Sequence, residues 1–125
     1  MERNAISLFS SSGIGDLGMH ANGINTVVAC ELIKERMDLF QNNNPGTQCF
    51  CGDIWKLEDE IVDFYRSKYE ESPFLILATP PCQGMSPNGM GKMLSDYRKG
   101  LRPQYDKRNR LIIPAVHIIK KLQPQ

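Results

Sequence analysis

A cysteine on a stiff turn is the residue of this sequence with the clearest potential for covalent chemistry. Cys82 follows two prolines at the end of the apolar run Phe74–Ala78, which predicts a short buried strand. Because proline fixes φ and removes a backbone donor, Pro80 and Pro81 end strand pairing and stiffen the turn. A thiol placed there can act as a nucleophile, but free cysteines are also among the most buried residue types. Taken alone, the turn fits either a nucleophile or a structural cysteine.

Three further groups of residues that could bind a ligand follow apolar segments that predict strands. The small residues of Ser10–Gly15 follow the first segment and let a ligand approach the backbone. Glu31 follows the second, where a carboxylate in a nucleotide-binding sheet commonly accepts hydrogen bonds from ribose hydroxyls. After the third, Asp53 could accept a hydrogen bond from an exocyclic amine and Ile54 could pack on a base. Each signal is weak alone, but together they favour a nucleoside-containing cofactor beside a nucleophile.

Apolar segments alternate with helical patterns along the chain. The predicted strands are short, continuous apolar runs, at Ala5–Phe9, Thr26–Cys30, Gln48–Cys51 and Phe74–Thr79. The predicted helices follow these strands in turn, at Asp16–Asn22, Leu32–Gln41, Leu57–Tyr69 and Asp106–Leu122. This alternation predicts an α/β fold with about four parallel strands in a doubly wound, Rossmann-like sheet. With the strand order 3-2-1-4, the loops after the first and fourth strands would lie side by side, where ligands bind in such sheets.

Apolar spacing also predicts which face of each helix packs inward. The second predicted helix has an apolar side made of Leu32, Ile33, Met37 and Phe40. The third has an apolar stripe made of Leu57, Ile61, Phe64 and Tyr65. The last is expected to pack inward through Leu111, Ile112, Ala115, Ile118 and Ile119. Pro114 predicts a kink in this last helix or a late start.

The composition suits one modest globular domain. The chain has 125 residues, of which 41% are apolar, enough for one core. It has neither an apolar run near the roughly 18 residues of a membrane span nor a secretory signal pattern, so we expect a cytoplasmic protein. The net charge of +1 argues neither for nor against a polyanionic partner. Basic residues cluster, however, at Lys92, Arg98, Lys99, Arg102, Lys107, Arg108 and Arg110. This basic segment fits a phosphate-contacting surface or a solvated, charged loop.

The cysteines do not form a recognisable framework. Cys30, Cys49, Cys51 and Cys82 match neither zinc-ligand spacing nor a redox Cys-x-x-Cys pair. Cys49 and Cys51 lie two apart in a predicted strand, so they point to the same face and are expected in the core. We therefore expect no metal site, and a reducing compartment.

The glycines narrow the choice of cofactor. Gly13, Gly15 and Gly18 do not match the G-x-G-x-x-G pattern, so a pyrophosphate cradle is not indicated. A nucleoside cofactor without phosphates, such as S-adenosylmethionine, fits better.

With these features in place, the sequence resembles the DNA (cytosine-5) methyltransferases over essentially its whole length. Pro80–Gln83 is similar to that family's catalytic motif, and Phe9–Gly15 to its first, cofactor-binding motif. Glu31 falls where the family has its ribose-binding acid, and Gly52–Ile54 resembles its adenine-binding motif. Asp106–Leu111 is similar to a later Asp-x-Arg-x-x-Leu motif. The resemblance implies the Rossmann-like fold of S-adenosylmethionine-dependent methyltransferases.

The same resemblance implies the roles of individual residues. Cys82 is the implied catalytic nucleophile. The residues implied to bind S-adenosylmethionine are Phe9, Ser11, Gly13, Glu31, Leu32, Asp53, Ile54, Pro81 and Leu111. The first motif departs from the family pattern, because Ser11 stands in place of the usual first glycine and Ile14 in place of the second glycine of a Gly-Gly pair.

The chemistry that the resemblance implies begins with the thiolate of Cys82. It attacks carbon 6 of a cytosine, which activates carbon 5 toward the methyl group of S-adenosylmethionine; loss of the carbon 5 proton and of the cysteine completes the reaction. The base must be flipped out of double-stranded DNA to be reached. Arg108 and Arg110 are candidates for the electropositive setting that a thiolate needs, with phosphate or surface contact as the alternative. Residues Gly84–Tyr105 fit a mobile element that closes over DNA, or a disordered loop.

Several parts of the family pattern are not found within these 125 residues. They are a Glu-Asn-Val motif, a Gln-x-Arg-x-Arg motif, a target-recognition domain and a final helix. We therefore expect residues 1–125 to be the N-terminal part of the catalytic domain of a bacterial or phage restriction–modification enzyme. The alternatives are a cofactor-binding half that needs a C-terminal half on another chain, and a small-molecule thiol enzyme on the same fold. An incomplete sheet would also expose an edge and favour self-association.

Overall fold

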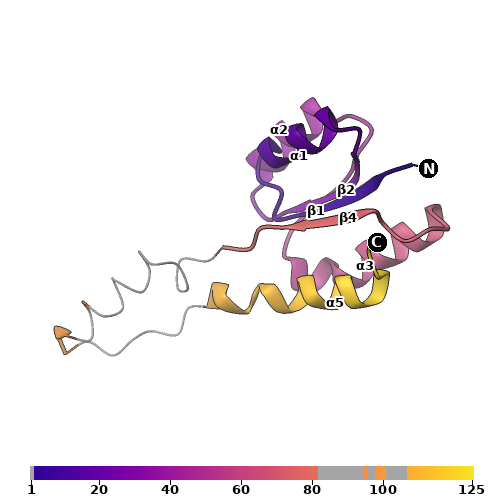
Figure 1. Cartoon of the computed structure of the whole chain (residues 1–125). Coiled ribbons are helices and arrows are strands. Elements are labelled where there is room, and N and C mark those ends of the chain that lie inside the picture. The colour runs from indigo at the N-terminus through magenta and orange to yellow at the C-terminus, as the bar shows by residue number, and fades with distance from the viewer. Residues whose placement is uncertain (1, 82–94, 96–97, 101–106) are drawn as a thin grey trace.

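Four parallel strands form one sheet between two layers of helices (Figure 1). The computed structural model describes residues 2–81, 95, 98–100 and 107–125. In this part of the chain the strands are β1 (Asn4–Leu8), β2 (Asn25–Glu31), β3 (Gln48–Cys51) and β4 (Leu75–Ala78). Their order is β3-β2-β1-β4 and every pairing is parallel. The predicted α/β class and strand order are confirmed.

Helices cover both faces of this sheet. Helices α1 (Ile14–Ala21) and α2 (Lys34–Asn43) lie on one face, and α3 (Ile54–Lys68) and α5 (Ile112–Leu122) lie on the other (Figure 1). The predicted helices are present, with the ends of the first three shifted by a few residues. Such shifts are expected because cap geometry, which apolar spacing does not report, sets where a helix begins and ends.

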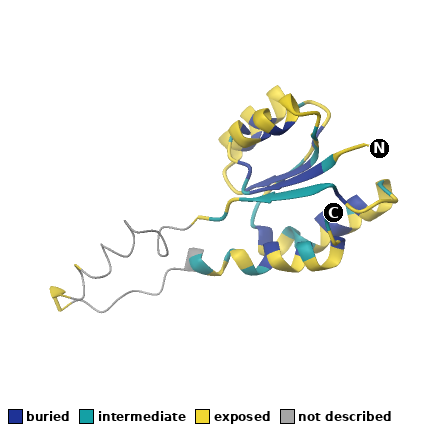
Figure 2. Ribbon diagram, viewed as in Figure 1, coloured by how far each residue is buried: buried dark blue, intermediate teal, exposed yellow. Residues whose placement is uncertain are grey.

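The main core lies between the sheet and the α3–α5 layer. Its buried members come from β1, β2, α3 and α5: Ile6, Leu8, Val28, Cys30, Ile54, Ile61, Val62, Tyr65, Ala115, Ile118 and Leu122. Leu57 and Phe64 pack against this cluster, so the predicted stripe of α3 is confirmed. Figure 2 shows the contrast within the sheet: β1 and the second half of β2 are buried, whereas β4 is half-buried along its length.

A second, smaller cluster lies under α2. Ala29 of β2 packs there with Met37 and Phe40. Leu32 and Ile33 were expected on the same apolar side, but they are 65% and 39% exposed. The prediction was wrong for these two residues because α2 begins only at Lys34, which leaves both in the connection after β2.

The last helix starts later than its apolar spacing predicts. A short 3-10 helix, η1 (Lys107–Arg110), comes first, and α5 begins at Ile112 with Leu111 as its N-cap. Pro114 therefore falls in the first turn, where a backbone N–H would have no partner within the helix. This confirms the late start. Ile112 was expected to pack inward but is 48% exposed, because it lies at the first position of α5, whose inward side is formed by Ala115, Ile118 and Leu122.

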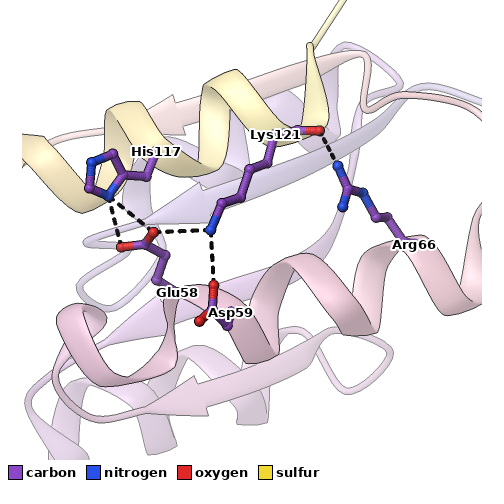
Figure 3. Close-up of polar contacts among 5 residues, drawn as sticks. All are labelled: Glu58, Asp59, Arg66, His117 and Lys121. Carbon is purple, nitrogen blue, oxygen red and sulfur yellow. Dashed lines mark hydrogen bonds and ion pairs between the residues drawn. The ribbon is translucent and has the colours of Figure 1, made fainter.

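Polar side chains join α3 to α5 on the outside of the helix layer (Figure 3). The Glu58 carboxylate lies 3.0 Å from His117 Nδ1 and 3.3 Å from Lys121 Nζ. Lys121 Nζ also lies 2.9 Å from Asp59 Oδ1, and Arg66 donates a hydrogen bond of 2.6 Å to the Lys121 carbonyl. These carboxylates raise the pKa of Lys121 above its usual value. Apart from Glu58 these side chains are well exposed, and exposed pairs stabilise little, so the apolar core remains the main connection between α3 and α5.

The three described cysteines differ in their environments. Cys30 is buried, and desolvation raises the pKa of its thiol to about 12. Cys49, which was predicted to lie in the core, is half-buried and packs against the second cluster without belonging to its buried members. Cys51 was predicted to lie in the core but is exposed, because it is the last residue of the edge strand β3.

The described part of the chain shows neither a metal-binding cluster nor a membrane-spanning helix. No set of three or more His, Cys, Asp or Glu side chains there is arranged to hold a metal ion. Among the same residues, no helix combines the length and apolar character needed to cross a membrane.

Candidate functional site

The carboxyl ends of all four strands meet along one edge of the sheet. Hydrogen bonds link these ends in the order of the strands: Gly52 N donates to the Glu31 carbonyl at 3.0 Å, Ser10 N to the Cys30 carbonyl at 3.1 Å, and Thr79 N to the Leu8 carbonyl at 3.3 Å. The residues that the sequence singled out after each strand therefore occupy neighbouring positions. Crevices at this edge of an open parallel sheet are where such folds bind their ligands.

The loop after β1 has an unusual backbone. Phe9, Ser11 and Gly13 have φ values of +59°, +53° and +92°, in the left-handed region that favours glycine. Two of the three are not glycines; such residues cost on the order of 1–3 kcal/mol each and keep the conformation only where their surroundings enforce it. The loop is held by a hydrogen bond from Gly13 N to the Ser10 carbonyl at 3.1 Å. Strain of this kind is typical of segments shaped for a ligand.

Gly13 allows this loop to lie directly on α2. A Cβ atom at Gly13 would come within 2.6 Å of a ring carbon of Phe40, whose side chain is fully buried. Gly13 is also the N-cap of α1, and the Leu17 amide donates to its carbonyl at 3.1 Å. A glycine is therefore required both by the backbone angle and by the close approach to Phe40.

Glu31 ends β2 with a carboxylate that is oriented and only 7% exposed. Its Oε2 atom accepts a hydrogen bond of 2.8 Å from the Leu32 amide, and its Oε1 atom lies 3.7 Å from Arg36 Nη1. A carboxylate fixed in this way at a strand end can accept hydrogen bonds from vicinal hydroxyls without reorganising. Leu32, next to it, exposes most of its side chain.

Two predicted cofactor residues after β3 also have structural roles. Asp53 is the N-cap of α3, and its Oδ1 atom accepts a hydrogen bond of 3.0 Å from Trp55 N. Ile54 is 4% exposed and belongs to the main core, so little of its side chain is presented to the sheet edge. The neighbouring Trp55 is 42% exposed.

A cavity of about 160 Å³ opens between the ends of β1 and β4 and the first turn of α1. Its lining comes from these three elements and the loops that follow β1 and β4: Ser7, Phe9, Ser10, Ser11, Ile14, Gly15, Asp16, Leu77 and Thr79. It includes two predicted cofactor residues, Phe9 and Ser11. It does not include Glu31, Asp53 or Leu111, and Leu111 packs instead against the main core.

Most of this lining belongs to the predicted segment Phe9–Gly15, but the residues from the strands and from the rest of α1 were missed. Ser7 and Asp16 were not singled out, although a serine within an apolar strand and an acid in the first turn of the following helix were visible signals. Thr79 was placed in the fourth strand, and its hydroxyl donates to the Phe9 carbonyl at 3.2 Å, which joins the loops after β1 and β4. The place of the cavity between the ends of β1 and β4 was predicted, but the contributions of Ser7 and Asp16 were not, because they depend on the packing of α1 against the sheet.

The catalytic candidate lies just beyond the described residues. The described chain runs to Pro81, an exposed residue after the end of β4, and Cys82 follows it in the sequence. The described residues do not include Cys82, nor the Gly84–Tyr105 loop apart from residues 95 and 98–100. The basic residues Lys92 and Arg102 belong to this loop and are therefore not described. Their predicted roles remain predictions.

The fold and this edge define an α/β protein of the doubly wound type with a ligand crevice at the carboxyl ends of its strands. The family model for C-5 cytosine-specific DNA methylases matches residues 3–125. The chain therefore belongs to the C-5 cytosine-specific DNA methylase family, as its motifs predicted.

Relatives and a solved structure agree with this assignment. The type II methyltransferase M1.HgaI of Avibacterium volantium is 36% identical over 99% of this chain, which covers 33% of that protein. The type II methyltransferase M.AquIA of Picosynechococcus sp. is 29% identical over 100% of this chain, which covers 46% of it. A crystal structure described as a prophage-encoded DNA modification methyltransferase (E. coli) superposes with a TM-score of 0.72 and 26% identity, over 97% of this chain and 29% of its own. The chain thus spans less than half the length of these relatives.

Proposed function

We propose that this chain carries the methyl-donor site and the nucleophile of a DNA (cytosine-5-)-methyltransferase. The reaction is transfer of a methyl group from S-adenosylmethionine to carbon 5 of a cytosine flipped out of double-stranded DNA. The observation that carries this proposal is the alignment of four strand ends in the order β3-β2-β1-β4, which places the left-handed loop Phe9–Gly13 between Glu31 and the turn that leads to Cys82. The family, whose relatives include type II methyltransferases, supports a place in restriction–modification.

The described residues fit a nucleoside methyl donor. Glu31 offers a buried, oriented carboxylate for the ribose hydroxyls, and Leu32 exposes an apolar side chain next to it. Asp53 offers its carboxylate to an exocyclic amine while it caps α3. The cavity is smaller than the roughly 300–1,000 Å³ of a typical small-molecule site, so we assign it to one end of the donor, with the nucleoside end along β2 and β3.

The chain's own chemistry centres on Cys82. Its thiolate forms a bond to carbon 6 of the cytosine, and the ring electrons displaced by this attack make carbon 5 nucleophilic. S-adenosylmethionine supplies an electrophilic methyl group at that carbon. Removal of the carbon 5 proton then expels the Cys82 thiolate and restores the ring. Pro80 and Pro81 restrict the turn that presents the thiol, which reduces the entropy lost on attack.

Covalent trapping tests the nucleophile assignment. DNA containing a mechanism-based cytosine analogue that blocks loss of the carbon 5 proton is incubated with the chain and S-adenosylmethionine. We expect a denaturation-resistant protein–DNA adduct with wild type and none with Cys82→Ser. Cys51→Ser is the matched control, because Cys51 is the exposed thiol among the described cysteines, and it should trap as wild type does. An adduct that persists in Cys82→Ser would overturn the assignment.

The second candidate function is a donor-binding half that is inert without another chain. It is favoured by β4, which pairs only with β1 among the described residues and stays half-buried. The same trapping assay separates the two functions. If no adduct forms alone but one appears on adding the separately expressed C-terminal remainder of a relative, the chain is a half-enzyme.

A further inference from the structure

Asp16 lines the cavity, but nothing described so far gives its buried carboxylate a role. It lies in the first turn of α1 and is 3% exposed. Ser7 of β1 donates a hydrogen bond of 3.1 Å to its Oδ2 atom, and Thr26 of β2 donates one of 2.6 Å to its Oδ1 atom. Both oxygens are thus bound by hydroxyls from two neighbouring strands. A buried carboxylate without such donors would be costly, so this arrangement is a built polar contact.

The sheet is irregular where Thr26 enters this contact. Ala5 pairs with Thr26, but the next residue, Ile6, pairs with Val28 rather than Val27. This register shift places one extra residue in β2. Irregularities of this kind re-aim side chains, and this one allows Thr26 and Ala29 to lie on the α1–α2 face although they are three residues apart. The strand distortion therefore serves the contact with Asp16.

Asp16 lies only three residues after the strained loop. Gly13 is the N-cap of α1, so any shift of the first turn of α1 displaces the loop that ends there. The other end of this loop leaves β1 shortly after Ser7. The Asp16–Ser7 hydrogen bond consequently spans both ends of the segment in which Phe9 and Ser11 keep positive φ angles. Ser7 and Asp16 also line the cavity.

We infer that Asp16 is a positioning residue, which holds the loop Phe9–Gly13 in the conformation that receives the methyl donor. It acts by tying α1 to β1 and β2, and it does not take part in the reaction. This inference rests on the proposed function for its ligand, but the conformation of the loop can be followed without any ligand.

Hydrogen exchange of single amides tests the inference directly. Thr26→Val removes the hydroxyl with little change of shape, whereas Thr26→Ser keeps the hydroxyl. In the 125-residue chain without donor, we expect Thr26→Val to speed exchange of the Gly13 and Leu17 amides about tenfold, because one charge-assisted hydrogen bond to Asp16 is lost. The Gly52 amide, bound to the Glu31 carbonyl at the far side of the site, should change less than about twofold. In Thr26→Ser these amides should exchange as in wild type, and in Asp16→Asn they should exchange faster than in Thr26→Val.

Donor binding and a stability control complete the test. The dissociation constant for S-adenosylmethionine should rise about tenfold in Thr26→Val and recover in Thr26→Ser. Ile61→Val, a core change remote from the loop, should lower stability without altering either readout. If loop exchange in Thr26→Val is no faster than in Ile61→Val, or if donor affinity is unchanged while wild type binds, the inference is overturned. If exchange responds but wild type binds no donor, the loop-holding role stands and the donor assignment fails.

Discussion

Replacing Gly13 by alanine probes the loop at its tightest point. The new Cβ would lie 2.6 Å from one ring carbon of Phe40 and 2.9 Å from another, well inside ordinary van der Waals contact. The Phe40 ring is fully buried against Ala29 and Met37 and cannot swing away freely. The φ angle of +92° at Gly13 adds a penalty for any residue with a side chain.

The expected loss of stability is the sum of these effects. A left-handed backbone costs an L-residue about 1–2 kcal/mol, and overpacking a filled core costs about 1–3 kcal/mol. The smaller entropy of the unfolded alanine chain returns about 0.4–1 kcal/mol. We therefore expect Gly13→Ala to lower the free energy of unfolding by about 1–4.6 kcal/mol, out of the roughly 5–15 kcal/mol typical of a domain.

Gly18→Ala is the matched control in the helix that follows the loop. Gly18 lies inside α1, and a Cβ there meets nothing within 4 Å. This substitution should raise the free energy of unfolding by about 0.5–1 kcal/mol, because alanine is the better helix former. Urea unfolding followed by far-UV circular dichroism measures both variants. If the two variants unfold within about 0.5 kcal/mol of each other, the structural account of the loop is refuted.

Two further predictions concern the remaining strand ends. Burial raises the pKa of the folded Cys30 thiol to about 12 from the ordinary 9.0, so the unfolded chain loses this proton first as pH rises above about 9. The free energy of unfolding should therefore fall between pH 9 and pH 10, and it should fall less in Cys30→Ala. Parallel pH profiles of the two proteins in urea titrations would contradict this. Asp53→Ala should lower the free energy of unfolding by about 1 kcal/mol through loss of the α3 N-cap, whereas Asp53→Asn should retain most of it; equal losses would show that the cap is unimportant.

The order of the sheet was predictable because its strands are short continuous apolar runs separated by helical spacing. Parallel connections then allow few topologies, and the order that places the loops after β1 and β4 together is the one found. The side of α3 that packs inward was predictable for the same reason, since Ile61 and Tyr65 recur at helical spacing. Most of the fold was therefore predictable from elements that keep one consistent apolar pattern along their length.

Details of the site depend on features that no periodic pattern reports. The contact between Asp16 and Thr26 needs a register shift between β1 and β2, which is a property of two strands together. The positive φ angles of Phe9 and Ser11 break the usual rule that such angles belong to glycine. The exposure of Leu32 follows from the late start of α2. In each case tertiary packing overrides the local preference, as expected at functional sites.

The most direct measurement of the central claim is the affinity of the chain for S-adenosylmethionine with and without the Glu31 charge. Glu31→Gln keeps the size of the side chain and an oxygen for the Leu32 amide. Glu35→Gln, an exposed acid at the start of α2, removes the same charge nearby. Calorimetry should show one-to-one binding by wild type and Glu35→Gln, and affinity lower by about 10- to 100-fold in Glu31→Gln, because hydrogen bonds to a charged acceptor are lost. Absence of binding by wild type, or equal affinity in all three proteins, would contradict the assignment of this sheet edge to a methyl donor.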